Sequence, residues 1–218
     1  MKNIFKILIL SILLAQIPNE CSAQDSVDNR KIFISIHSGA FFPSWGEFKD
    51  VYHSPCAFIN GISLGIPFTN KGFFVYAKGM YFQKSGTPIV YHFEYNDLTG
   101  EVTTWTTQEG ECKYQQWLGN IGIQYNLNLG LANILMFNGG ITLFQQSYKI
   151  KNSTAGSEAK GFNGLFMGIG YEKRILRKIG LFSEAQYNFD VRRFKILDYE
   201  IRLKYGGANV NVGMKYYF

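Results

Sequence analysis

The sequence predicts an all-β protein, an eight-stranded antiparallel up-and-down transmembrane β-barrel. The first observation behind this prediction is a set of eight segments in which apolar and polar residues alternate with a period of two, as in strands with one apolar face. The second is that the connections between these segments are alternately long and short. The composition agrees, because 17% aromatic residues and 23 glycines accompany only 17% charged residues, fewer than the roughly one quarter of an average domain.

The predicted strands place an apolar face opposite a face of glycine, asparagine, glutamine and single charges. In the fourth segment, for example, Ile121 and Ile123 alternate with Asn120 and Gln124. The third segment is aromatic on both faces, so its orientation stays open. No amphipathic helix longer than about two turns is predicted. The strands are expected at residues 32–42, 57–68, 72–84, 114–127, 134–144, 162–171, 179–189 and 209–218.

The connections place the strand ends in two groups. Short connections are expected at 69–71, 128–133 and 172–178. Long connections are expected at 43–56, 85–113, 145–161 and 190–208. With eight strands, all the short turns then lie at one end of the barrel together with both chain termini, and all the long loops lie at the other.

An even number of alternating strands with short turns at one end and long loops at the other is typical of outer-membrane barrels. Hydrocarbon offers the backbone no hydrogen-bond partner, so a sheet crosses a membrane only when it is closed. Aromatic residues lie near the strand ends, for example Trp117, Tyr171 and Phe189, as expected at the two membrane interfaces. The opposite face carries small polar residues, which suit the narrow interior of an eight-stranded barrel. Both observations favour an apolar face toward lipid. The structural alternative is a soluble lipocalin-like barrel with its apolar face inside.

Residues 1–23 have the pattern of a secretory signal. Lys2 and Lys6 flank the start of an apolar run, and a small-residue stretch ends at Ala23, where cleavage is expected. The run is too short for a helical membrane anchor. We therefore expect a signal peptide at 1–23, one barrel domain at 24–218, and a location in the bacterial outer membrane with periplasmic termini.

The charge balance favours anionic lipid partners. Removing Lys2, Lys6 and Glu20 reduces 22 basic and 16 acidic residues to 20 and 15. This mild cationic excess suits outer membrane lipid and lipopolysaccharide. Nucleic acid is not an expected partner of an exported chain.

Two motifs carry a resemblance to a known family. The first is the segment from Gly79 to Gly86, which is similar to a Tyr-x-Gln-Lys-Gly strand end, and the second is the C-terminal Gly-Met-Lys-Tyr-Tyr-Phe at 213–218. With these motifs the chain resembles the outer membrane β-barrel proteins of the Bacteroidetes type, which include PorT-like proteins and are related in architecture to OmpW- and OmpX-like barrels. The resemblance implies that Tyr216 and Phe218 belong to the signal read by the barrel assembly machinery, which would be a partner.

Two residue pairs are candidates for bonds between strands. Glu184 and Lys215 fall on the polar faces of adjacent strands, and because a buried charge needs a partner, we expect an interior ion pair. Cys56 and Cys112 are expected near the same rim. An exported protein favours a disulfide between them, and two unpaired buried thiols are the alternative.

Ser35 and His37 are the residues that come nearest to a catalytic arrangement. They share a strand face, as in a pairing that resembles the Ser/His pair of lipid A deacylases. The alternative for His37 is an interior polar side chain satisfied by its neighbours, and this is the interpretation we prefer. No catalytic residue, metal site or cofactor is therefore predicted.

The second long loop is predicted to form a hairpin over 87–107 that extends beyond the membrane. Tyr91, Phe93 and Tyr95 alternate along its first half, and Trp105 lies in its second half. Exposed hairpin edges and aromatic residues can pair with a partner protein by strand addition. The alternative is a hairpin that only caps the barrel mouth.

The fourth long loop is rich in cations. They are Arg192, Arg193, Lys195, Arg202 and Lys204. Two interpretations of this loop stay open. Its cations could contact lipopolysaccharide phosphates, or they could form a solvated rim.

These features favour a non-enzymatic surface protein whose long loops mediate interaction or adhesion. One alternative is a narrow porin or carrier for small solutes, although eight strands normally leave no open aqueous pore. Another is an accessory component of a secretion or assembly machine, which the PorT-like resemblance implies.

Overall fold

The structure is a computed structural model that describes residues 31–44, 48–87, 89–95, 102–108, 110–130, 132–151, 156–189, 191–196, 199–204 and 206–218. Eight strands build its main body. They are β1 (Phe33–Pro43), β2 (Ala57–Pro67), β3 (Phe73–Gly86), β6 (Cys112–Gly130), β7 (Asn133–Ile150), β8 (Gly156–Leu176), β9 (Ile179–Phe189) and β12 (Gly207–Tyr217). The smaller elements are the helix α2 (Phe48–Tyr52) and the strands β4 (Ile89–Tyr95), β5 (Val102–Gln108), β10 (Val191–Ile196) and β11 (Tyr199–Lys204).

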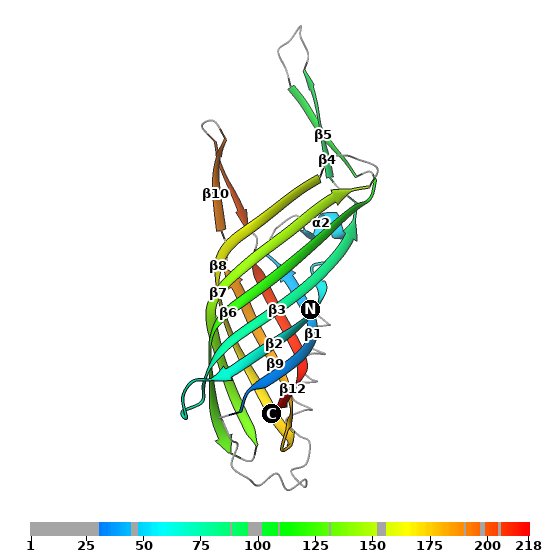
Figure 1. Cartoon of the computed structure of the whole chain (residues 1–218). Coiled ribbons are helices and arrows are strands. Elements are labelled where there is room, and N and C mark those ends of the chain that lie inside the picture. Colours follow the sequence, from blue (N-terminus) through cyan, green and yellow to red (C-terminus); the bar gives the residue numbers. More distant parts are fainter. Residues whose placement is uncertain are drawn as a thin grey trace.

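The eight strands form a closed antiparallel barrel in the order β1-β12-β9-β8-β7-β6-β3-β2 (Figure 1). The first and last strands close it, with Phe33 opposite Tyr217 and Pro43 opposite Gly207. Each barrel strand therefore pairs on both edges, as a membrane-spanning sheet must. The predicted fold class is confirmed. The predicted signal peptide at 1–23 lies outside the described residues and stays a prediction.

The two ends of the barrel differ as predicted. Short turns join β2 to β3, β6 to β7 and β8 to β9 at the end where β1 begins and β12 finishes; we call this the turn end. At the other end, the two-stranded sheets β4–β5 and β10–β11 project beyond the barrel (Figure 1). We call this the hairpin end. The hairpin predicted at 87–107 is present as β4–β5.

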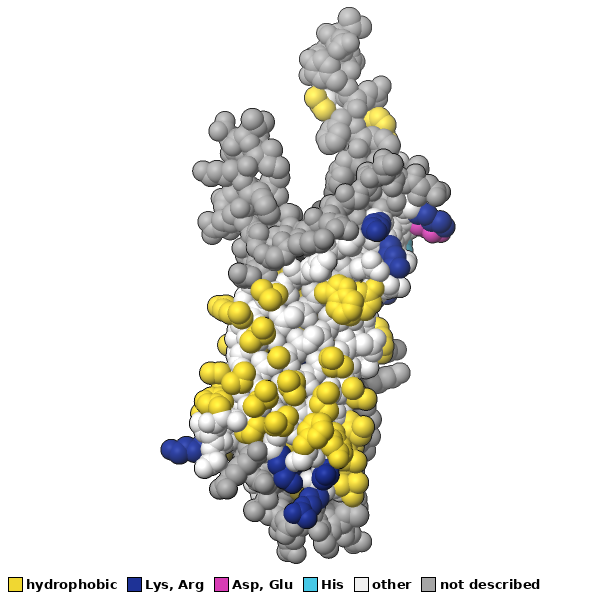
Figure 2. Space-filling model, in the orientation of Figure 1, with side chains coloured by type: hydrophobic (Ala, Val, Ile, Leu, Met, Phe, Trp, Pro, Cys, Tyr) yellow, Lys and Arg dark blue, Asp and Glu magenta, His cyan; other side chains and the backbone are white. Residues whose placement is uncertain are grey.

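The barrel wall has an apolar outside and a largely polar inside. On β2, Ile62 is 60% exposed whereas its neighbour Ser63 is 5% exposed. Hydrophobic side chains cover the middle of the barrel in Figure 2, and lysine and arginine side chains lie toward either end. This arrangement is the reverse of a soluble barrel, and it is typical of a wall surrounded by hydrocarbon. The lipocalin-like alternative is therefore wrong.

The orientation of β3 was open from the sequence. Its burial alternates strictly, so that Phe74, Tyr76, Lys78, Met80 and Phe82 face the interior. Aromatic residues on both faces had concealed this alternation. The buried charge Lys78 marks the inner face.

Three parts of the hairpin end differ from the prediction. β7 and β8 continue through most of the expected loop 145–161, with Gln145 opposite Lys160 and Lys149 opposite Gly156. The fourth long loop contains the hairpin β10–β11, and the first contains α2. On β7, Gln145, Gln146 and Ser147 follow one another, so this part of the strand lacks the apolar alternation by which the membrane-spanning strands are predicted. In the part of the chain that the structure describes, no helix is long and apolar enough to cross a membrane.

Candidate functional site

A cluster of charged side chains surrounds Glu172 in the interior at the turn end. The buried Glu172 carboxylate accepts hydrogen bonds from the Tyr217 hydroxyl at 2.6 and 2.8 Å and from Arg174 Nε at 2.9 Å. Lys215 Nζ lies 3.0 Å from its second oxygen. The Arg174 guanidinium also lies over the Tyr217 ring, with Cζ 3.2 Å from the ring centroid. One carboxylate thus meets two cations in a space closed to water.

A second buried ion pair joins Lys78 of β3 to Glu184 of β9. Because three strands separate β3 from β9 around the barrel, this pair crosses the interior. Lys78 Nζ also donates to Gln186 Oε1 at 3.1 Å, and Glu184 accepts a hydrogen bond from Asn138 Nδ2 at 3.1 Å. Both charges therefore have the additional hydrogen bonds that a buried pair requires.

The polar network continues toward the hairpin end. Gln186 Nε2 donates to Asn188 Oδ1 at 2.8 Å, and Asn120 Nδ2 lies 3.3 Å from the same oxygen. The Thr142 hydroxyl donates to Asn120 Oδ1 at 2.8 Å. Amide and hydroxyl groups from β6, β7 and β9 thus hold the middle of the interior together.

The predicted ion pair between Glu184 and Lys215 is not formed. Both side chains face the interior, as expected, but Glu184 pairs with Lys78 and Lys215 with Glu172. The register explains the difference: Lys215 lies opposite Gly180, four residues from Glu184 along β9. At about 3.3 Å per residue, this is a separation of about 13 Å along the strand.

The helix α2 lies in the barrel mouth at the hairpin end. Phe48, Val51 and Tyr52 are buried, and the Thr87 N–H donates to the Val51 carbonyl oxygen at 2.9 Å. The Tyr52 ring centroid lies 6.1 Å from that of Tyr114 on β6. The helix packs on an apolar cluster from the inner wall, formed by Phe41, Ala57, Ile59, Met80, Phe82, Cys112, Leu118 and Phe144. The interior is therefore apolar near the mouth, in contrast to the expected face of glycine, asparagine and glutamine.

Ser35 and His37 are not hydrogen-bonded to each other. The Ser35 and Ser63 hydroxyl oxygens are 2.6 Å apart, and neither nitrogen of the buried His37 ring has a hydrogen-bond partner among the described residues. The His37 side chain packs against two inward-facing glycines: a Cβ added to Gly61 would lie 2.4 Å from His37 Nε2, and one added to Gly213 would lie 2.8 Å from His37 Cβ. His37 thus faces the interior as predicted, but the prediction that neighbours satisfy its ring nitrogens is wrong.

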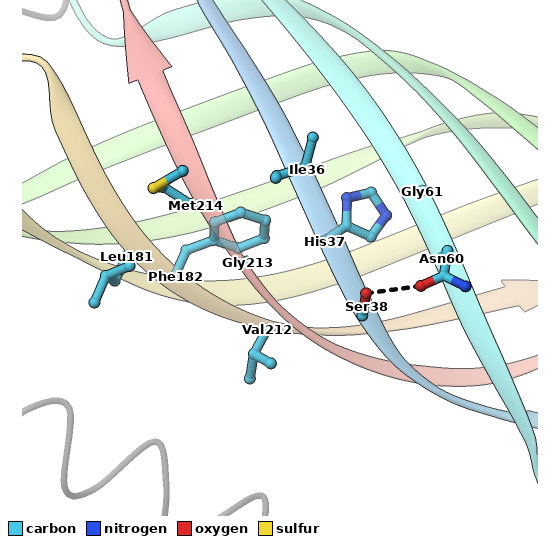
Figure 3. Close-up of a pocket in the computed structure, with 10 residues that line it drawn as sticks. All are labelled: Ile36, His37, Ser38, Asn60, Gly61, Leu181, Phe182, Val212, Gly213 and Met214. Atoms are coloured by element: carbon cyan, nitrogen blue, oxygen red, sulfur yellow. Dashed lines mark hydrogen bonds between the residues drawn. The ribbon is translucent and has the colours of Figure 1, made fainter.

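A pocket of about 570 Å³ lies at the barrel wall across β2, β1, β12 and β9 (Figure 3). His37, Gly61, Phe182 and Gly213 belong to the inward faces of these strands. The outward members are Ile36, Ser38, Asn60, Leu181, Val212 and Met214. A hydrogen bond of 2.7 Å from the Ser38 hydroxyl to Asn60 Oδ1 lies among them. The pocket contains no charged side chain and lies in the apolar belt, so its chemistry suits apolar groups.

The predicted disulfide is not formed in the structure, where Cys56 and Cys112 are free thiols. Cys112 is buried in the apolar cluster of the mouth. Cys56 is half-buried, and its backbone N–H donates to Ser54 Oγ at 3.4 Å. The two cysteines thus occupy different environments of the same rim.

The residues proposed for assembly lie outside the barrel at the turn end. Phe218 is 62% exposed and Tyr216 39% exposed, and their ring centroids are 5.3 Å apart. The Phe218 N–H donates to the Ile32 carbonyl oxygen at 3.1 Å. Alternate apolar residues of the C-terminal strand therefore face the surrounding lipid.

The hairpin β4–β5 is a separate two-stranded sheet. Its register places Tyr91 opposite Thr106, Phe93 opposite Thr104 and Tyr95 opposite Val102. These three aromatic residues thus occupy alternate register positions of β4. Trp105 of β5 lies opposite His92 in the register and is 45% exposed. The structure thus places the four predicted aromatic residues on the two strands of one hairpin.

Among the described residues, no group of three or more histidine, cysteine, aspartate or glutamate side chains is placed to hold a metal ion.

Comparison with known proteins agrees with the topology. The chain superposes on Neisserial surface protein A with a TM-score of 0.53 at 11% identity, covering 86% of this chain and 96% of that chain. The fold is that of an outer membrane β-barrel. The N-terminal β-barrel domain of Pseudomonas aeruginosa OprF gives a TM-score of 0.48 at 10% identity over 87% of this chain and 98% of that chain. Ail, the attachment invasion locus protein of Yersinia pestis, gives a TM-score of 0.44 at 11% identity, covering 86% of this chain and 97% of that chain.

The sequence itself has no such counterpart. No family model matches it, and no curated protein matches it. The structural similarity, at this level of identity, concerns the fold alone.

Proposed function

We propose that the protein is a non-enzymatic binding protein of the bacterial outer membrane that recognises a protein partner through the β4–β5 hairpin. The observation that carries this proposal is that β4–β5 forms its own sheet, separate from the barrel. Within the described residues, each of its strands pairs in a sheet only with the other strand of the hairpin. Strands at the edge of a sheet accept an extended segment of another chain through backbone hydrogen bonds.

The residues of the hairpin suit this mode of recognition. Tyr91, Phe93 and Tyr95 alternate along β4, and β-branched Thr104 and Val102 are the register partners of Phe93 and Tyr95. Val102 is 59% exposed and Trp105 45% exposed. Aromatic residues supply large contact areas at protein interfaces. The backbone edge would provide affinity and these side chains selectivity.

The filled interior favours binding over conduction. The charged cluster around Glu172, the pair Lys78–Glu184 and the apolar contacts of α2 follow one another along the barrel. Eight-stranded barrels are narrow enough for side chains to fill them. We therefore prefer a surface binder to a porin or carrier.

The rest of the chain serves as the membrane anchor in this proposal. Export would use the signal at 1–23, Tyr216 and Phe218 would be read by the assembly machinery, and the turn end would face the periplasm. The hairpin end would then be extracellular. The resemblance to PorT-like proteins allows the partner to be a component of a secretion machine.

The test compares the full chain with a variant that lacks the hairpin. Gly86 and Cys112 are paired on β3 and β6, so residues 89–108 can be replaced by a short Gly-Ser turn with the barrel left closed. A matched control replaces 191–204, the β10–β11 hairpin, in the same way. Proteins in nanodiscs are used to select peptides from a displayed library.

The proposal predicts peptides rich in β-branched and aromatic residues that bind the full chain and the control but not the 89–108 variant. Trp105→Ser weakens this binding, whereas Trp117→Ser on the lipid-facing wall leaves it unchanged. Peptides that bind the full chain and the 89–108 variant equally would refute the assignment to this hairpin.

A further inference from the structure

The pocket across β2, β1, β12 and β9 opens on the outer surface of the barrel wall. On β1 and β12 it is lined by residues 36–38 and 212–214, and the first and last residue of each run face outward. Among the described residues, its lining includes none of β3, β6, β7 or β8, which form the opposite wall. A cavity inside so narrow a barrel would also touch that wall. The pocket is therefore a groove on the lipid-facing surface, which we call the wall groove (Figure 3).

The wall groove is apolar at one end and polar at the other. Leu181, Met214 and Ile36 are neighbours in the register, and they line the part nearer the turn end. Two residues farther along the strands, Ser38 lies opposite Asn60, and its hydroxyl donates to Asn60 Oδ1 at 2.7 Å (Figure 3). The polar part thus lies toward the hairpin end. This is the polarity of a lipid in the leaflet at the hairpin end, whose oxygen atoms lie toward that end and whose chains lie away from it.

Asn60 is an exposed amide within the apolar belt. Its outward neighbours along β2 are the exposed Phe58 and Ile62. The Asn60 Nδ2 group carries two N–H donors, and neither makes a hydrogen bond within the part of the chain that the structure describes. Tyr81, its register partner on β3, donates its hydroxyl to Gln83 Oε1 at 2.9 Å instead. Hydrocarbon offers no acceptor, so unpaired donors are unfavourable there, and the amide points to a ligand with an acceptor oxygen.

From this arrangement we propose that the wall groove binds one acyl chain of an ester-linked membrane lipid, whose carbonyl oxygen accepts a hydrogen bond from Asn60 Nδ2. The chain lies along Ile36, Leu181 and Met214, and the carbonyl group lies at the polar end of the groove. The lipid belongs to the leaflet at the hairpin end. This site goes beyond the proposed recognition through β4–β5 and does not depend on it.

The shape and the chemistry of the wall groove both favour a lipid chain as its occupant. Its volume of about 570 Å³ is lined without a charged side chain, which suits hydrocarbon, and its single polar end supplies the donors that a carbonyl oxygen accepts. Phe58 and Ile62 project from β2 on either side of Asn60. A slender chain therefore reaches the amide more readily than the wall of a second barrel does.

The test measures binding of two phosphatidylcholines to the full chain in neutral detergent, by native mass spectrometry. One lipid has ester-linked palmitoyl chains, and the other is its ether-linked analogue, which lacks the carbonyl oxygens. Asn60→Leu removes the amide from the wall groove. Gln145→Leu is the matched control, because it removes an exposed carboxamide from β7, on the opposite side of the barrel. Heat-modifiable migration on gels confirms that each variant is folded.

We expect the parent and Gln145→Leu to bind the ester-linked lipid about three- to tenfold more tightly than the ether-linked lipid, as for the gain of one hydrogen bond. Asn60→Leu should bind the two lipids equally. Val212→Phe, which fills the wall groove from β12, should weaken the binding of both lipids.

Three results would each overturn the proposal. They are equal affinities of the parent for the two lipids, a preference for the ester-linked lipid that survives Asn60→Leu, and unchanged binding in Val212→Phe. A dimer of the parent that Asn60→Leu abolishes would also overturn it, because the amide would then pair with a second copy of the chain.

Discussion

The Lys215 ammonium lies 3.0 Å from the Glu172 carboxylate, and both side chains are buried inside the barrel near its turn end. Arg174 and Tyr217 bind the same carboxylate. A single acidic group of β8 therefore binds two residues of β12, past the intervening strand β9. The stability of the barrel should depend on this group more than on any exposed charge.

Glu172→Gln is expected to destabilise the barrel by about 3–5 kcal/mol, because it leaves buried cations without their counter-charge. The free energy of unfolding is measured in urea with lipid vesicles, from the fluorescence of the lipid-facing Trp117. Glu111→Gln is the matched control. Its carboxylate pairs with Lys151 at 2.8 Å, where it raises the pKa of that ammonium, but both side chains are more than 60% exposed. The control should leave unfolding nearly unchanged, and equal effects of the two substitutions would contradict the assignment.

The pair Lys78–Glu184 gives a prediction about coupling. Lys78→Met leaves Glu184 unpaired in the interior, and Glu184→Leu leaves Lys78 unpaired. Each substitution should therefore lower the free energy of unfolding by about 3–5 kcal/mol. The double substitution should cost less than the sum of the two, because no uncompensated charge remains. Additive losses in a double-mutant cycle would show that the two residues do not form the pair.

Gly65 gives a prediction about packing against Phe33. The two residues are cross-strand partners, and a Cβ added to Gly65 would lie 2.1 Å from Phe33 Cε1. Gly65→Ala should therefore cost about 1–3 kcal/mol, as overpacking does. A Cβ added to the outward-facing Gly79 meets no atom of the described residues within 4 Å, so Gly79→Ala should be neutral or stabilise the strand by up to about 1 kcal/mol. The reverse order of these two effects would contradict the assigned faces.

The cysteines give a chemical prediction. Cys56 and Cys112 are free thiols, so a protein lacking residues 1–23, prepared without reductant and denatured, should show two reactive thiols per chain. In the folded barrel, the half-buried Cys56 should react before the buried Cys112. A thiol titre of zero in the denatured protein would demonstrate the disulfide that the sequence suggested.

The sequence was most informative where lipid imposes a pattern. Outward residues such as Ile62 and Ile121 must be apolar, so their alternation with Ser63 and Asn120 marks each membrane-spanning strand. The continuation of β7 beyond Phe144, with Gln145, Gln146 and Ser147 in succession, has no such alternation and was therefore predicted as a loop. The five-residue helix α2 is shorter than any segment that hydrophobic periodicity resolves.

The interior partners were predicted less well, for a geometric reason. Alternation correctly assigns Glu184 and Lys215 to the inner face, but partner choice depends on the stagger between strands and on contacts across the barrel. Lys78 reaches Glu184 from a strand that is far away in both sequence and sheet order. Phe82 faces inward and Tyr81 outward, but both are aromatic, so the sequence did not distinguish the two faces here. The apolar lining of the barrel mouth was therefore not predicted.

Spin labelling at two adjacent residues tests most directly the central claim, a membrane-spanning barrel with its apolar face outward. Single labels are placed at Ile62→Cys or Ser63→Cys, in a background with Cys56→Ser and Cys112→Ala, and the barrels are refolded in vesicles. The account predicts that the label at 62 collides frequently with oxygen dissolved in lipid, whereas the label at 63 is shielded from both oxygen and a water-soluble nickel chelate. A label at 62 accessible to the nickel chelate, or a label at 63 accessible to lipid oxygen, would contradict it.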